Sequence, residues 1–110
     1  MTTTDLPDAI AAFVRAANAQ DLNGVAACFA DDAVVRDEGR DRAGAQAIRE
    51  WAEEVSQKYR PLLEALSVNA ENGRTVMIGR VSGAFPGSPL DLHYQFTIKG
   101  NKISRLEIAP

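Results

Sequence analysis

Residues 90–99 read LDLHYQFTIK, and apolar and polar residues alternate along the whole stretch. Successive side chains of a β-strand point to opposite faces of a sheet, so the pattern predicts a strand with one apolar face. Lys99–Lys102 (KGNK) follows as a tight turn in which a glycine or asparagine takes a positive φ angle, and residues 103–108 return as a second strand. The stretch therefore predicts an antiparallel hairpin.

The same period of two extends back to Pro61. Residues 62–68 indicate a strand, Asn72–Arg74 (NGR) a turn, and residues 76–84 a further strand. The residues FPGSP at positions 85–89 form a loop between this strand and the opening stretch. The second half of the chain is thus predicted to be a meander of antiparallel strands.

The first sixty residues show helical spacing instead. A first helix is expected to begin at a cap on Thr4 or Asp5, with Pro7 in its first turn, and a second helix at a cap on Asp21. A short strand over residues 33–37 and a polar loop, EGRDRAG, precede a third helix over residues 45–57. The apolar faces of the three helices are predicted to carry Ile10, Phe13, Val14 and Ala17; Leu22, Val25, Ala26 and Phe29; and Ile48, Trp51, Ala52 and Val55.

Helices that precede a run of strands are typical of an α+β fold, here a single domain over residues 1–110. A curved sheet cannot pack flush against three helices along its whole length. The arrangement therefore predicts a cavity between helices and sheet, which suits an apolar ligand.

Composition excludes several classes of function. The net charge is −3 and the 12 basic residues are scattered, so we expect no nucleic-acid partner. Cys28 and His93 are the only cysteine and histidine, which excludes an internal disulfide, a cysteine metal cluster and a two-histidine metal site. Cys28 lies in the apolar run VAACF and is interpreted as a buried small residue. No segment is long enough to span a membrane and the N-terminus is polar, so a cytoplasmic location is expected.

Three runs together resemble a known family: NAQDLNGVAACFADDAVVRDEG at 18–39, GAQAIREW at 44–51 and LHYQFTIKGNKISRLEI at 92–108. They resemble the nuclear-transport-factor-2-like (NTF2-like) superfamily, and within it SnoaL-like proteins and steroid Δ-isomerases. The resemblance implies a cone-shaped curved antiparallel sheet wrapped around N-terminal helices, with an internal apolar pocket, and often a homodimer formed through the outer face of the sheet. The superfamily contains isomerases, cyclases, dehydratases, epoxide hydrolases and non-enzymatic binders.

The resemblance assigns a role to Asp37. In steroid isomerases this position holds the carboxylate that takes a proton from the carbon next to a carbonyl. A carboxylate at the rim of an apolar cavity is partly desolvated, which raises its pKa and makes it a better base. The tyrosine and protonated acid that stabilise the oxyanion in those enzymes fall on Phe13 and Leu92, and neither side chain can donate a hydrogen bond. A surface acid paired with a neighbouring arginine is the alternative interpretation of Asp37.

Two further residues are candidates for the site. Arg80 shares a strand face with Val76 and Ile78, so it points inward if they do; if Val81 is the inward residue, Arg80 is solvated. Tyr94 lies on the apolar face of the 90–99 strand, where its hydroxyl either donates to a ligand or belongs to a core aromatic. The predicted catalytic residues are therefore Asp37, Tyr94 and Arg80, and the residues predicted to line the ligand site are Phe13, Trp51, Ile78, Leu92 and Phe96.

The sequence therefore predicts a protein that binds a small hydrophobic molecule, with proton-transfer chemistry at Asp37 and no metal or organic cofactor. One alternative is a non-catalytic binding or scaffolding domain. The other is epoxide hydrolysis, in which Asp37 and Arg80 supply two members of an Asp-Arg-Asp set. A homodimer is expected, because the outer face of the long strand carries the polar residues Asp91, His93, Gln95 and Thr97.

Overall fold

A computed structural model describes residues 6–110. The elements in chain order are α1 (Asp8–Asn18), α2 (Leu22–Ala27), β1 (Phe29–Asp37), β2 (Arg40–Ala43), α3 (Ala45–Tyr59), β3 (Leu62–Glu71), β4 (Arg74–Ser82), β5 (Leu90–Lys99) and β6 (Lys102–Ala109). The residues Thr4 and Asp5, expected to cap the first helix, lie outside the described residues. The expected cap of the second helix is confirmed, because the Asp21 carboxylate accepts a hydrogen bond of 3.0 Å from the Gly24 backbone N–H.

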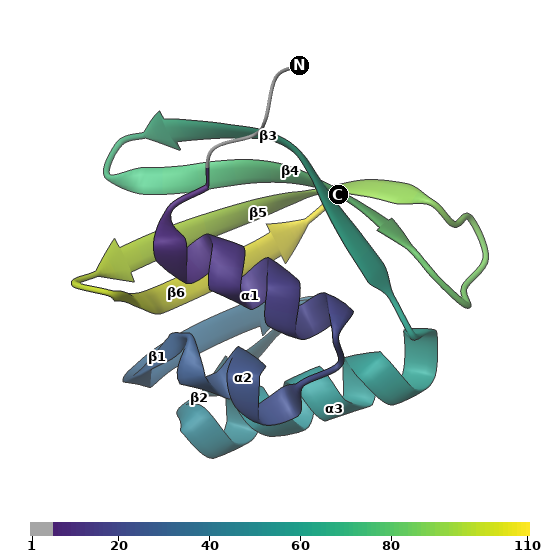
Figure 1. The fold of residues 1–110 in the computed structure, drawn as a ribbon, viewed down its shortest axis with the longest axis horizontal. Helices are drawn as coiled ribbons and strands as arrows, with labels where there is room; N and C mark the ends of the chain where they lie inside the picture. The colour runs from purple at the N-terminus through teal and green to yellow at the C-terminus, as the bar shows by residue number, and fades with distance from the viewer. Residues whose placement is uncertain (1–5) are drawn as a thin grey trace.

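The six strands form one sheet in the order β2-β1-β6-β5-β4-β3. All neighbouring pairs are antiparallel except β1 and β6, which run parallel, so the sheet is mixed and mostly antiparallel. Figure 1 shows the three helices gathered on one side of the curved sheet, with the β3–β4 hairpin at one end and β1–β2 at the other. The predicted α+β architecture is confirmed.

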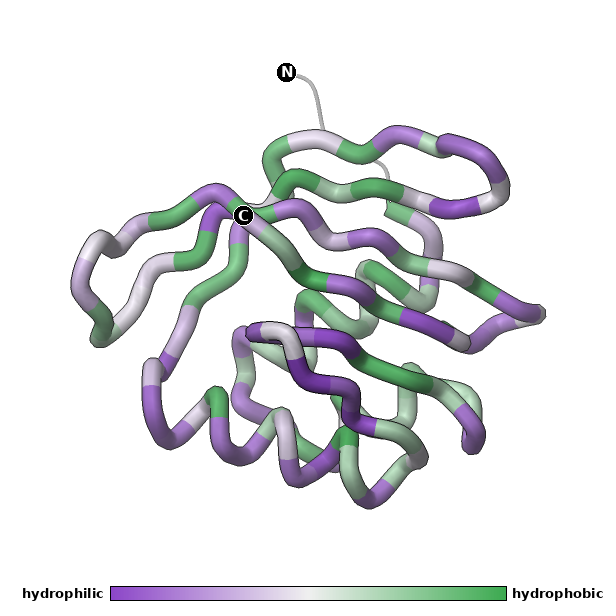
Figure 2. The backbone as a smooth tube through the Cα atoms, turned by 180° about the vertical axis from the view of Figure 1, so that it is seen from behind, coloured by the Kyte–Doolittle hydropathy of each residue, from purple (hydrophilic) through white to green (hydrophobic). Residues whose placement is uncertain are grey.

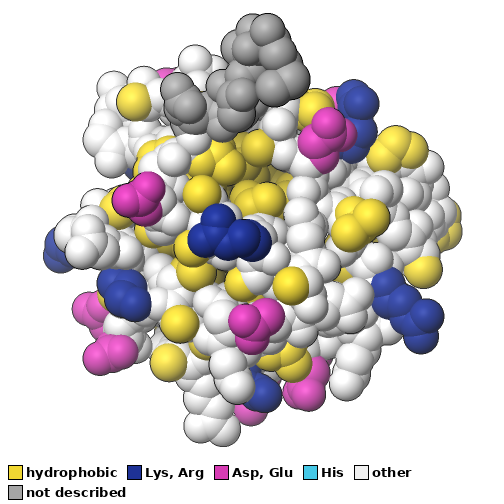
Figure 3. Space-filling view, viewed as in Figure 1, with side chains coloured by type: hydrophobic (Ala, Val, Ile, Leu, Met, Phe, Trp, Pro, Cys, Tyr) yellow, Lys and Arg dark blue, Asp and Glu magenta, His cyan; other side chains and the backbone are white. Residues whose placement is uncertain are grey.

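The core lies between the helices and the inner face of the sheet. Ile10 and Phe13 of α1, Ile48 and Trp51 of α3, and Phe96 of β5 are each at most 7% exposed. Seen from behind in Figure 2, hydrophobic and hydrophilic residues alternate along the strands, as a sheet with one covered face requires. Figure 3 shows hydrophobic side chains in the middle of the helix-bearing face, with one basic side chain among them and further charged side chains around them. No helix within residues 6–110 is long and apolar enough to cross a membrane.

Two expectations for the first half of the chain are wrong. The EGRDRAG segment contains strand β2, which pairs with the end of β1, so Asp37 lies opposite Arg40. Its polar residues gave no alternating signal, because strand pairing depends on backbone hydrogen bonds and an exposed edge strand needs no apolar face. Phe29 does not belong to the second helix either; it begins β1 and pairs with Ile103. It remains buried, at 5% exposure.

The orientation of β4 decides which of its residues face the helices. Met77 lies opposite Tyr94 and Ile78 opposite His93 in the antiparallel pair with β5. Residues directly opposite each other project from the same face of a sheet, so the inward Tyr94 fixes Met77 as inward and the exposed His93 fixes Ile78 as outward. Val81 is consequently inward as well, and Arg80 is outward.

Candidate functional site

The space between the helices and the sheet contains a cavity of about 360 Å³. Its walls come from all three helices, the end of β1, the inner faces of β3, β4, β5 and β6, and the loop that follows β4. Aromatic side chains make up much of the lining, namely Phe13, Trp51, Tyr59, Phe85 and Tyr94. The only ionisable carboxylates or bases among the described lining residues are Asp37 and Glu38.

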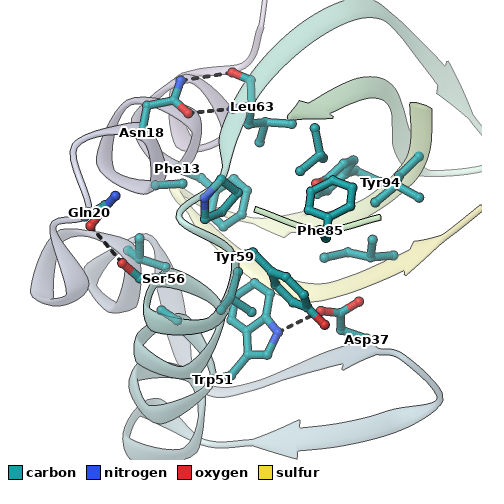
Figure 4. A pocket seen from close by; sticks show the side chains of 18 of the residues that line it. Phe13, Asn18, Gln20, Asp37, Trp51, Ser56, Tyr59, Leu63, Phe85 and Tyr94 are labelled. Atoms are coloured by element: carbon teal, nitrogen blue, oxygen red, sulfur yellow. Dashed lines mark hydrogen bonds between the residues drawn. The ribbon is translucent and has the colours of Figure 1, made fainter. Parts of the chain in front are cut away.

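Asp37 is held at one end of this cavity by Trp51 (Figure 4). It is the last residue of β1, and the Trp51 indole N–H on the inner face of α3 donates a hydrogen bond of 3.0 Å to its carboxylate. Burial raises the pKa of Asp37, and the charge of Glu38 acts in the same direction, whereas the hydrogen bonds from Trp51 and from the Glu38 backbone lower it. Desolvation is the largest of these effects, so the net result is a carboxylate that is more basic than usual.

Tyr94 places a hydroxyl in the same cavity. Its side chain is 6% exposed, and Gly79 on β4 leaves the space that its ring occupies, because a Cβ at Gly79 would lie 2.8 Å from Tyr94 Cε1. Burial and the Asp37 carboxylate both raise the pKa of Tyr94, and no hydrogen bond contributes to the shift. Tyr94 is therefore a neutral donor that has no hydrogen-bond partner within the described chain and lies close enough to Asp37 to be affected by its charge.

Glu38 and Tyr59 form a second hydrogen-bonded pair beside the first. The Tyr59 hydroxyl donates to Glu38 Oε1 at 3.0 Å, and the Tyr59 ring packs edge-on against Phe85, with ring centroids 5.7 Å apart. Phe85 belongs to the loop between β4 and β5, which is tied to the end of α3 by a hydrogen bond of 2.8 Å from Ala84 N–H to the Tyr59 carbonyl. Glu38 is exposed and Tyr59 and Phe85 are half-buried, whereas Trp51 and Tyr94 are buried, so the Glu38–Tyr59 pair lies nearer the mouth of the cavity.

Polar groups on the opposite side of the cavity are already paired. The Asn18 amide bonds both backbone groups of Leu63, donating at 2.9 Å to the carbonyl and accepting at 2.7 Å from the N–H. Gln20 accepts a hydrogen bond of 3.0 Å from the Ser56 hydroxyl. Figure 4 shows both pairs across the cavity from Asp37. They close the wall between α1, α3 and β3, and Asp37 and Tyr94 remain as the partly or largely buried polar groups that a ligand inside can contact.

A smaller polar recess of about 110 Å³ lies on the other side of Asp37 and Glu38. Arg42 of β2 makes two hydrogen bonds there, of 3.0 and 3.1 Å, to the Glu54 carboxylate. Arg40 and Lys58 also line this recess but not the main cavity. The bases near the site are thus separated from the apolar cavity by Asp37, Glu38 and the side chains hydrogen-bonded to them.

Three of the five residues predicted to line the ligand site do line the cavity, namely Phe13, Trp51 and Leu92, and so do two of the three predicted catalytic residues, Asp37 and Tyr94. The prediction of Arg80 as a catalytic residue is wrong. Of the two orientations that the sequence left open, Arg80 takes the solvated one, on the outer face, where it pairs with Asp91 at 2.9 Å because the two residues are cross-strand neighbours. That position removes the Asp-Arg-Asp set expected for epoxide hydrolysis. The hydrogen bond to the Asp91 carboxylate raises the pKa of Arg80, whereas burial raises the pKa of Tyr94. Arg80 thus behaves as a surface residue and Tyr94 as a buried one.

The predictions for Ile78 and Phe96 as lining residues also need correction. Ile78 projects to the outer face beside His93, for the reason given by the register of β4 and β5. Phe96 is fully buried and packs edge-on against Phe13, with ring centroids 5.7 Å apart, so it supports the cavity wall from behind. Phe96 is a core residue, since it does not contribute to the lining.

Sequence reasoning missed several residues of the site, chiefly Glu38, Tyr59 and Phe85. Glu38 directly follows the predicted strand, Tyr59 lies two residues beyond the predicted helix, and Phe85 lies in a loop, so no periodicity applies to any of them. Only Asp37-Glu38-Gly39 held a usable signal, because a glycine that follows two polar residues between strands is typical of a hairpin. Among residues 6–110 no group of three His, Cys, Asp or Glu side chains is arranged to hold a metal ion.

The sequence profile described as the SnoaL-like domain matches residues 10–106. A proposed polyketide cyclase from Sinorhizobium meliloti is 38% identical, with 94% of this chain and 95% of that chain aligned and a TM-score of 0.90. No curated protein matches the chain.

More distant structures share the fold alone. A protein with a ketosteroid isomerase-like fold from Catenulispora acidiphila, solved in complex with trimethylamine, is 16% identical over 98% of this chain and 87% of that chain, with a TM-score of 0.84. A computationally designed binder of 17-OHP is 16% identical over 93% of this chain and 87% of that chain, with a TM-score of 0.78. Together with the similar fold of an NTF2-like protein from Cytophaga hutchinsonii, TM-score 0.76, these likenesses confirm the NTF2-like fold expected from the sequence.

Proposed function

The chain belongs to the SnoaL-like domain family, and we propose that its cavity binds a small hydrophobic carbonyl compound on which Asp37 acts as a general base. The observation that carries this proposal is the Asp37 carboxylate itself. It opens onto an apolar cavity, burial raises its pKa, and Trp51 fixes its orientation.

The chemistry follows from the position of the two polar groups. Asp37 takes a proton from the carbon next to the carbonyl, and the electron pair of the broken C–H bond moves onto the carbonyl oxygen as an enolate. The Tyr94 hydroxyl is the donor placed to hydrogen-bond that oxygen. Return of the proton to another carbon completes an isomerisation. Alternatively, the enolate carbon attacks a second carbonyl of the same molecule, the electron pair of that C=O bond moves onto its oxygen, and the proton held by Asp37 goes to this oxygen, which completes a cyclisation, the reaction class suggested by the 38% identical relative.

The proposal is tested by converting a 5-ene-3-ketosteroid to its conjugated enone, followed by absorbance. Wild type is compared with Asp37→Asn, with Tyr94→Phe and with Asp32→Asn, an exposed acid of the same strand as a matched control. We expect turnover in wild type and in the control, loss of it in Asp37→Asn, and a fall of roughly 10²–10³-fold in Tyr94→Phe, the effect of removing one oxyanion donor. Turnover that survives Asp37→Asn would refute the role of Asp37 as the base.

A ligand-binding role without catalysis is the second candidate. It is favoured by the small number of donors available, because Trp51, Tyr59 and Ser56 each donate to another side chain, and Tyr94 and the exposed Gln20 amide remain. No turnover of the ketosteroid by wild type, together with equal ligand affinity in wild type and Asp37→Asn, would support this role.

We also propose a homodimer through the outer face of the sheet. The polar residues of β5 on that face take part in cross-strand pairs, such as Arg80–Asp91 and a hydrogen bond of 2.9 Å from Arg74 to Gln95. Sedimentation at micromolar concentration tests the proposal. A monomer at all concentrations would refute it.

A further inference from the structure

The charges around the cavity divide into two sets. Both ionisable carboxylates of its lining, Asp37 and Glu38, open onto the apolar space, whereas Arg40, Arg42 and Lys58 line only the recess behind them. The charged groups that line the cavity itself are therefore negative, and the positive groups lie farther from a ligand inside it. The apolar lining strengthens the field of the half-buried Asp37, whereas the exposed Glu38 acts on a ligand at the mouth at short range.

Glu38 reaches the cavity through an unusual backbone conformation. Alternation along a strand would direct residue 38 to the face opposite Asp37, but Glu38 has φ of 55° and Gly39 φ of 75°, and the chain turns back into β2. Two successive residues with positive φ make the tight turn that suits a two-residue hairpin. The turn brings two consecutive carboxylates to the same cavity.

Aromatic rings lie beside the outer of these two carboxylates. Tyr59 donates its hydroxyl hydrogen to Glu38 and packs against Phe85, so both rings border the mouth of the cavity next to that charge. Rings next to a carboxylate are the surroundings in which proteins bind organic ammonium groups, because the faces of aromatic rings attract cations. The Tyr59 ring already attracts a cation, since Lys58 Nζ lies 5.0 Å from its centroid.

Deeper in the cavity, the Tyr94 hydroxyl indicates that the ligand carries a second polar group. Its side chain is 94% buried, lines the cavity and receives no hydrogen bond that would alter its pKa. The Tyr94 hydroxyl has no hydrogen-bond partner within the described chain, so a polar group of a ligand in the cavity can accept from it. The cavity thus offers a neutral polar contact inside and negative charge at the mouth.

We propose that the cavity selects hydrophobic amines, with the protonated amine at the mouth against Glu38 and the rings of Tyr59 and Phe85, and that it rejects anions of the same shape. The inference rests on the proposed function in that it places the ligand in the same cavity and names its class. It assigns the charged end of the ligand to Glu38 and leaves Asp37 and Tyr94 to the reacting carbonyl.

The test uses three probes that share a naphthalene ring and differ in charge: 2-(aminomethyl)naphthalene, 2-naphthalenemethanol and 2-naphthoate. Calorimetric titration at neutral pH gives their dissociation constants. We expect the amine to bind about tenfold more tightly than the carboxylate, with the alcohol between them. Equal affinities, tighter binding of the carboxylate, or no binding of the amine at millimolar concentration would overturn the inference.

Four variants locate the effect. In Glu38→Gln, which keeps an acceptor for the Tyr59 hydroxyl, we expect the amine and the alcohol to bind within about twofold of each other, whereas Glu71→Gln at the remote β3–β4 hairpin leaves the preference unchanged. Lys58→Gln removes the competing cation near Tyr59 and should tighten amine binding two- to threefold. If Asp37→Asn abolishes the preference and Glu38→Gln does not, the assignment to Glu38 is wrong.

These outcomes are independent of the turnover assay. Amine selectivity without ketosteroid turnover removes the proton-transfer proposal and leaves the inference of amine selection. Turnover without amine selectivity removes the inference of amine selection and leaves the proton-transfer proposal.

Discussion

The Asn18 amide joins α1 to the edge strand β3, and its removal should destabilise the fold measurably. Asn18 is the last residue of α1 and donates to the Leu63 carbonyl at 2.9 Å while accepting from the Leu63 N–H at 2.7 Å. β3 has a single strand neighbour, β4, so these two backbone groups of Leu63 depend on the side chain. The Asn18 amide therefore pairs with the backbone of Leu63 as a neighbouring strand would.

The magnitude follows from those two bonds. A hydrogen bond contributes about 1 kcal/mol net, so Asn18→Ala loses about 2 kcal/mol from the two bonds. Leu63 is 8% exposed, so its freed N–H and carbonyl are poorly solvated and add to the loss. Water entering from the adjacent cavity limits that addition, and we expect a total of about 2–3 kcal/mol. In a domain of this size the midpoint of thermal unfolding should fall by roughly 10–20 °C.

The assay is urea denaturation followed by the fluorescence of Trp51, the only tryptophan. Asn69→Ala is the matched control, because Asn69 lies on the same strand and is exposed, and it should change the free energy of unfolding by less than about 0.5 kcal/mol. A loss in Asn18→Ala no larger than in this control would refute the reasoning. It would mean that water replaces the amide without cost.

Three further predictions concern the base and its neighbours. Asp37→Asn should raise the free energy of unfolding at neutral pH, because burial raises the folded-state pKa of Asp37 above its unfolded value. The stabilising contribution of the protonated carboxyl is complete below about pH 4 and is lost as pH rises through the folded-state pKa. Urea titrations should therefore show a gain that disappears in acid, and an equal gain at both pH values would contradict this. Trp51→Phe removes a donor to the ionised carboxylate and should raise the pKa of Asp37 further, measured by carbon NMR of the aspartate carboxyls; a lower pKa would contradict the assigned hydrogen bond. Gly79→Ala should cost about 1–3 kcal/mol in urea denaturation, because its Cβ would lie 2.7 Å from Leu63 Cδ1 and 2.8 Å from Tyr94 Cε1; a neutral result would show that the Tyr94 ring moves freely.

Strands with one apolar face could be predicted well from the sequence, and strands without one could not. The alternation over residues 90–99 gave the bounds of β5, and the outward position of His93 followed from it. In β2 three of four residues are exposed, so side-chain pattern carried no information about its pairing. Its existence depends on backbone hydrogen bonds to β1, which the sequence does not display.

The inward face of β4 required information from its neighbour. In the run TVMIGRVSG, each of the two alternating sets of side chains contains apolar residues, and Gly79 has no side chain to distinguish them. Only pairing with β5 separates them, because it sets Arg80 opposite Asp91 and Met77 opposite Tyr94. The predicted role of Arg80 failed for that reason, whereas Asp37 and Trp51 lay on elements whose orientation a single buried face determined.

The turn after β1 connects the fold to the proposed chemistry. A hairpin residue with φ of 55° is commonly glycine, asparagine or aspartate, and glutamate there is a strained choice that costs of the order of 1–3 kcal/mol. The same turn places Asp37, whose ionised form burial destabilises, against the cavity. The turn itself is needed for the pairing of β1 with β2, but neither a glutamate at this φ nor a desolvated carboxylate before it is needed for that pairing or for core packing. Their common result is a pair of carboxylates at one apolar cavity, which is the arrangement that a base and a charged anchor for the ligand both require.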